Sequence, residues 1–92
     1  MQWSKLDVDT PALLLDLDAL ESNIARMAAF FAGREARLRP HCKTHKSVRI
    51  AQMQLAVGAN GITCAKVGEA EVMARAGIRD ILITNEIIGA FK

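Results

Sequence analysis

The residues best suited to chemistry form one cluster, the sequence Arg-Pro-His-Cys-Lys-Thr-His-Lys at residues 39–46. Four other basic side chains surround its central residue, Lys43: Arg39, His41, His45 and Lys46. Neighbouring positive charge and partial burial both favour the neutral form of an amine. A neutral lysine amine is the nucleophile that condenses with an aldehyde to form a Schiff base. The cluster is therefore a candidate Schiff-base site, although a solvated basic loop is the commoner structure for such a run.

The same segment contains side chains that bind zinc or act as nucleophiles, namely His41, Cys42 and His45, and Cys64 follows further along the chain. Their spacing matches no zinc-finger pattern. Adjacent strand residues such as His41 and Cys42 point to opposite faces. A structural zinc site is therefore a minor alternative. A Cys–His nucleophile pair is weaker still, because no third residue orients it. Cys64 is most simply a small buried apolar residue.

Other polar segments have plainer interpretations. Glu86 follows the last expected strand and is either an active-site acid or, as we favour, a surface loop residue. Residues 58–61 carry two glycines but match no phosphate-binding pattern, so they predict a helix stop and a turn. Asp16 and Asp18 are better explained by helix capping than by paired acid–base chemistry.

The elements that must position the cluster alternate between strands and helices. Apolar or alternating runs predict strands at residues 12–15, 36–43, 61–65 and 80–84. Helical periodicity predicts helices at residues 18–32, 47–57 and 67–76, each followed by a glycine. Asp18 and Ser47 are the expected caps of the first two helices. The last strand is a continuous apolar run, which is typical of burial on both faces.

The first helix carries an apolar stripe at helical spacing, consisting of Leu20, Ile24, Met27, Ala28 and Phe31, which we expect to face the core. The alternation of elements predicts right-handed β-α-β units and a parallel sheet. Two architectures fit, an open doubly wound sheet or part of a β/α barrel. A whole barrel needs about 250 residues. The chain stops soon after its last strand, so we expect it to be part of a longer barrel.

Composition limits the class of protein. A length of 92 residues allows one domain, and 51% hydrophobic with 24% charged residues is typical of globular proteins. A formal net charge of +2 is too small for a dedicated nucleic-acid binder. No apolar run approaches the roughly 18 residues of a membrane helix, and no secretory signal is visible. We therefore expect a soluble cytoplasmic protein with two reduced cysteines and neither a nucleic-acid nor a membrane partner.

Several segments together resemble one known family. Residues 10–21, 39–46, 61–71 and 81–86 are similar to sequences of the D-threonine aldolase and D-serine dehydratase group. That group belongs to the alanine-racemase-like (fold type III) enzymes, which use pyridoxal 5′-phosphate (PLP). The eight-residue motif is the most specific part of the resemblance, which covers residues 9–89.

The resemblance implies a fold, a cofactor and a role for one residue. Residues 1–92 would be the N-terminal part of a PLP-binding TIM barrel, which a C-terminal β domain follows in the family. The strand at residues 12–15 would pair with that second domain. Lys43 aligns with the lysine that forms the internal aldimine and acts as an acid–base group. The family's phosphate-binding loops and divalent-metal ligands lie in later regions, so this chain is assigned no metal ligand.

The resemblance also implies a function: the N-terminal portion of a PLP-dependent lyase that acts on small D-3-hydroxy amino acids. Cα–Cβ cleavage and loss of the β-hydroxyl remain equally open, and full-length relatives are expected to form homodimers. A non-catalytic PLP-binding barrel protein and an inactive fragment are the alternatives. Unpaired strand edges and open apolar faces predict that the isolated chain is inactive and associates or is partly disordered.

Overall fold

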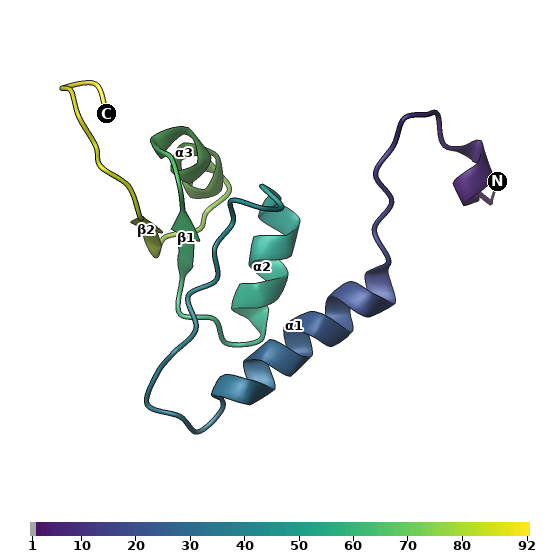
Figure 1. The fold of residues 1–92 in the computed structure, drawn as a ribbon, viewed down its shortest axis with the longest axis horizontal. Helices are drawn as coiled ribbons and strands as arrows, with labels where there is room; N and C mark the ends of the chain where they lie inside the picture. Colours follow the sequence, from purple (N-terminus) through teal and green to yellow (C-terminus); the bar gives the residue numbers. More distant parts are fainter. Residues whose placement is uncertain (1) are drawn as a thin grey trace.

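In a computed structural model that describes residues 2–92, a short parallel sheet packs against two helices, and a third helix leads away toward the N-terminus (Figure 1). The described elements, in chain order, are η1 (Lys5–Asp7), α1 (Leu17–Phe31), α2 (Val48–Ala56), β1 (Ile62–Cys64), α3 (Val67–Arg75) and β2 (Ile81–Ile83). The expected domain begins at Met1, which lies outside the described residues. None of the helices within residues 2–92 combines the length and apolar character that crossing a membrane requires.

The sheet pairs β1 with β2 in parallel, with Ile62 opposite Ile81. A third line of backbone lies on the other side of β1, where His41 and Thr63 form an isolated parallel bridge. The Thr63 N–H donates to the Pro40 carbonyl over 2.8 Å. The parallel β-α-β arrangement is confirmed. The prediction of a strand at residues 36–43 is wrong, because this segment forms only the one bridge. One reason is that Pro40 has no N–H to extend a ladder.

Side chains alternate in burial along β2, which places one of its faces in the core, whereas all three residues of β1 are buried. Seven buried residues form that core: Cys42, Ala51, Ile62, Cys64, Ala70, Met73 and Ile78. Ile81 and Ile83 pack against it. The residue between them, Leu82, points to the opposite face and is 50% exposed. The expectation that this strand is buried on both faces is therefore wrong, because α2 and α3 cover only one side of the sheet.

Local signals define the helix ends well, with one exception. Ser47 caps α2 as predicted, since its hydroxyl accepts the Ile50 N–H over 3.2 Å. Gly58 ends the helix with a φ of +106°, which L-residues rarely adopt. The exception is α1, whose cap is Asp16 and not Asp18. The Asp16 carboxylate accepts the Ala19 N–H over 3.0 Å, and Asp18 lies in the first turn instead.

The N-terminal region makes few contacts with the rest of the chain. Residues 12–15 are not a strand, contrary to expectation, and Leu13 is fully exposed. Within residues 2–92 no strand lies beside them, and an extended segment becomes a strand only when a neighbour accepts its hydrogen bonds. The apolar stripe of α1 is also incompletely covered, because Ile24 and Phe31 are half-buried and Met27 is 50% exposed.

Candidate functional site

The predicted motif lies at the carboxyl edge of the sheet. Cys42 ends the line of backbone that runs beside β1, with its N–H donating to the Thr63 carbonyl over 2.8 Å. The chain then turns, and the Lys46 N–H closes the turn on the Cys42 carbonyl over 2.8 Å. Lys43 is the first residue of this turn, and its side chain is exposed. This is the edge at which functional groups gather in parallel α/β folds.

Two histidines bracket the turn and make the same local contact. His41 Nδ1 accepts the N–H of Lys43 over 3.1 Å, and His45 Nδ1 accepts the N–H of Ser47 over 2.9 Å. Because a backbone N–H only donates, the hydrogen of each neutral ring lies on Nε2. Burial lowers the pKa of His45, which favours this neutral form. The imidazoles therefore serve as acceptors that shape the turn.

The ends of β1 and β2 contribute polar groups to which the sequence assigned no role. Thr84 Oγ1 lies 3.4 Å from His41 Nε2 and donates to the Cys64 carbonyl, also over 3.4 Å. The Asn85 amide donates to the Ala65 carbonyl over 2.9 Å. Their sequence signal was their place directly after an apolar strand. The next residue, Glu86, is exposed, as expected for a surface loop.

Glu69 brings a negative charge to the same edge. Its carboxylate accepts the N–H groups of Ala65 and Lys66 over 2.7 and 3.1 Å. The hydrogen bond from Ala65 holds the pKa of the Glu69 carboxyl below its ordinary value, and the nearby Lys46 ammonium adds to the effect. The sequence indicated only a first-turn acid, whereas the structure uses this side chain to fix the loop between β1 and α3.

The two cysteines lie under the motif, on the covered face of the sheet. Both are free thiols, with Cys64 fully buried as predicted. Burial raises the pKa of Cys42 to about 11 and also raises that of Cys64. Cys42 is buried while His41 is exposed, so the two side chains point apart. Among residues 2–92, no three His, Cys, Asp or Glu side chains are placed to hold a metal ion.

One of the expected basic neighbours of Lys43 faces elsewhere. Arg39 precedes Lys43 by four residues, in the segment that runs beside β1. Its guanidinium forms an ion pair with Asp80 over 2.7 Å, before the start of β2. No carboxylate among residues 2–92 pairs with Lys43. The expected crowd of basic groups around Lys43 is therefore smaller than predicted, and the exposed Lys43 side chain also lacks the partial burial that the prediction invoked.

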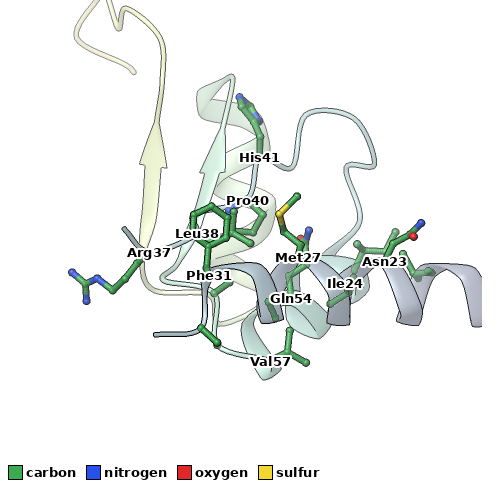
Figure 2. Close-up of a pocket in the computed structure, with 16 residues that line it drawn as sticks. Asn23, Ile24, Met27, Phe31, Arg37, Leu38, Pro40, His41, Gln54 and Val57 are labelled. Atoms are coloured by element: carbon green, nitrogen blue, oxygen red, sulfur yellow. The ribbon is translucent and has the colours of Figure 1, made fainter. Parts of the chain in front are cut away.

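A separate apolar groove of about 660 Å³ lies between α1, α2 and residues 37–41. Figure 2 shows Ile24, Met27 and Phe31 of α1 lining it, with His41 at one end. Lys43 does not line this groove. This apolar groove and Lys43 are therefore in different places in the described structure.

Comparison with known proteins agrees with this fold. Residues 15–89 match the family described as the alanine racemase N-terminal domain. D-threonine aldolase of Arthrobacter sp. is 51% identical over 85 residues, which are 92% of this chain and 22% of that protein. The crystal structure of D-threonine aldolase from Filomicrobium marinum superimposes with a TM-score of 0.89 at 55% identity, covering 92% of this chain and 23% of that one.

A dehydratase shows the same fold. A variant of D-threo-3-hydroxyaspartate dehydratase, solved in a metal-free form, gives a TM-score of 0.89 at 46% identity. The match covers 95% of this chain and 23% of the dehydratase. The chain thus spans about a fifth of the length of these relatives. With most of its residues matched by the family, the chain belongs to the alanine racemase N-terminal domain family.

Proposed function

We propose that this chain is the lysine-bearing N-terminal portion of a PLP-dependent lyase that acts on D-3-hydroxy amino acids. Lys43 is the residue that binds the cofactor and then serves as an acid–base group. One observation carries the proposal: the Lys43 amine is exposed, at the carboxyl edge of the parallel sheet, and no described carboxylate pairs with it. The similarity to an aldolase and a dehydratase, both named for D-configured hydroxy amino acids, supports the substrate class.

The chemistry of the motif fits an aldehyde cofactor. Cys42 is the nucleophile nearest to Lys43 in sequence, but burial raises the pKa of its thiol to about 11, so it stays protonated. Lys43 is exposed whereas Cys42 is buried, so of the two nucleophiles the amine is the one that an aldehyde can reach. PLP, when bound, withdraws electrons from the bond that breaks at the substrate Cα. The part of Lys43 is to hold the cofactor in place and to move a proton.

The turn restricts where the Lys43 side chain starts. Its backbone amide is held by His41 and the turn is closed by the bond from Lys46 to Cys42. A fixed origin limits the volume that a flexible lysine side chain samples, which favours one reacting geometry. Groups for the cofactor phosphate and for a divalent metal are not assigned to residues of this chain.

Several finer statements remain predictions. The relatives include an aldolase and a dehydratase, so Cα–Cβ cleavage and loss of the β-hydroxyl are both within reach of the family. Four further predictions stand beside these: kinship with D-serine dehydratase, homodimer formation, the absence of nucleic-acid and membrane partners, and a cytoplasmic location. So does the expectation that the 92-residue chain alone is inactive and associates or is partly disordered.

The decisive experiment is covalent trapping. The purified chain is mixed with PLP, reduced with borohydride and digested, and the modified lysine is located by peptide mass. We expect stoichiometric labelling at Lys43 that is lost in Lys43→Arg. Lys46→Arg is the matched control, because Lys46 is exposed on the same turn. Labelling spread over several lysines, or concentrated at Lys46, would overturn the proposal.

Turnover then separates the reaction types. Cα–Cβ cleavage of D-threonine releases glycine, whereas dehydration of D-threo-3-hydroxyaspartate ends in the release of ammonia. Because the 92-residue chain alone is expected to be inactive, turnover is assayed in the longer protein of which it is the proposed N-terminal portion. Labelling at Lys43 there without either product would favour the non-catalytic cofactor-binding alternative.

A further inference from the structure

A continuous line of hydrogen bonds crosses the strand ends beside the reactive lysine. It runs from the Lys43 amide through the His41 ring and the Thr84 hydroxyl to the Cys64 carbonyl, over 3.1, 3.4 and 3.4 Å. We propose that His41 is a positioning residue for Lys43, which it ties to the end of β2 through its Nε2–H tautomer.

Each donor in this line meets an acceptor. The Lys43 N–H can only donate, so His41 Nδ1 accepts and the ring hydrogen lies on Nε2. The Nε2–H then donates to the Thr84 oxygen, which leaves the Thr84 hydroxyl hydrogen for the Cys64 carbonyl. Hydrogen bonds that point the same way polarise one another and gain strength. The opposite tautomer would face the Lys43 N–H with a second hydrogen and break the line at its first bond.

Both side chains in the line are anchored by backbone pairing. The backbone of His41 is fixed by its bridge to Thr63. The backbone of Thr84 is fixed by its N–H, which donates to the Cys64 carbonyl over 3.0 Å. The acceptor of the Lys43 amide is therefore a ring held in place from two sides. No described backbone carbonyl accepts the Lys43 N–H, because the hydrogen bond that closes the turn comes from the Lys46 N–H.

The link to the cofactor rests on the proposed function, but the hydrogen-bond line itself does not. It is tested first without PLP. Nitrogen-15 NMR of the neutral ring reads the tautomer of His41, and solvent-exchange NMR reads the protection of the Lys43 amide. We expect the Nε2–H tautomer. Losing the acceptor in His41→Leu is expected to speed Lys43 amide exchange about fivefold, the equivalent of one ordinary hydrogen bond.

A conservative substitution at each position controls for variants that lose stability. The oxygen of His41→Asn can accept the N–H two residues on, as Asn does in Asx turns, and should restore most of the protection. Thr84→Ser keeps the hydroxyl and Thr84→Val removes it, so only the second should release the His41 ring. An Nδ1–H tautomer in the unmodified chain, or equal effects of His41→Asn and His41→Leu, would overturn the proposal.

The consequence for reactivity is read by PLP trapping, with Lys46 as the internal reference. We expect His41→Leu to lower the ratio of labelling at Lys43 to that at Lys46 about fivefold, with His41→Asn close to the unmodified chain. An unchanged ratio in His41→Leu would contradict the positioning role. If the unmodified chain is not labelled at Lys43 while the tautomer and exchange results hold, the proposed function fails and the hydrogen-bond line stands.

Discussion

Among the glycines, Gly61 has the least room for a side chain, and it lies directly before β1. Its φ is +82°, and a Cβ added there would lie 2.6 Å from the Asp80 carbonyl oxygen and 2.7 Å from the Asp80 Cγ. It would also meet the Arg39 guanidinium. Gly58 and Gly77 share the unfavourable backbone, at +106° and +94°, but have nothing within 4 Å of the added atom. The three glycines thus separate backbone strain from steric contact.

The magnitudes follow from these two contributions. A left-handed backbone costs an L-residue about 1–2 kcal/mol, which applies to all three alanine variants. Forcing an atom into filled space costs about 1–3 kcal/mol more, which applies only to Gly61→Ala because a backbone carbonyl cannot swing aside. We therefore expect losses of about 1–2 kcal/mol for Gly58→Ala and Gly77→Ala, and about 2–5 kcal/mol for Gly61→Ala. Alanine also lowers the conformational entropy of the unfolded chain, which favours folding, and this contribution is common to the three variants and cancels in the comparison.

Urea denaturation followed by circular dichroism measures these differences under one set of conditions. Complete unfolding of Gly61→Ala in buffer, with the other two still folded, is the limiting form of the expected result. Equal stability of Gly61→Ala and Gly58→Ala would refute the close approach of Gly61 to Asp80, and with it the way β1 begins beside β2.

Three further changes test other parts of the structure. Ser47→Ala removes the cap of α2 and should cost about 0.5–2 kcal/mol in thermal denaturation, with Ser47→Thr much milder. Burial raises the pKa of Cys42 from 9.0 to about 11, so at pH 8 the folded chain carries ~100-fold less Cys42 thiolate than the unfolded chain. Iodoacetamide should therefore modify Cys42 ~100-fold more slowly in the folded chain. Rapid modification of Cys42 would contradict its burial. Because burial lowers the pKa of His45 in the folded state, the unfolded state binds more protons below pH 6.5. The free energy of unfolding should therefore fall as the pH drops below 6.5 and be unaffected by this group above it, and His45→Gln should flatten the pH dependence.

Residues 39–46 show how far sequence reasoning reaches at the site. The motif and its place at the end of a line of backbone beside a parallel sheet were predicted, and Lys43 lies there, exposed. The hydrogen-bonding roles of the two histidines were not assigned. Each accepts an N–H only two residues away, but that contact depends on a turn that the sequence did not specify. Thr84 is 43 residues from His41, and only the pairing of β1 with both neighbours brings them together.

The helix ends show the same division. Ser47 and Gly58 were predicted correctly because a cap and a left-handed glycine act on backbone groups within one turn of themselves. Asp16 and Asp18 both carry the right side chain, and the choice between them followed from where the extended chain bends into α1.

The sequence by itself determined the parallel β-α-β order and the helix stops, and its motif singled out Lys43 as the candidate Schiff-base lysine, since each depends on local chemistry or on a specific motif. The tertiary structure alone decided which extended segments become strands. Residues 12–15 remain unpaired within the described chain, and residues 36–43 contribute one bridge. It also turned Arg39 toward Asp80 and left one face of β2 open. These outcomes depend on partners distant in sequence, because a strand or an ion pair exists only when another segment supplies the complementary groups.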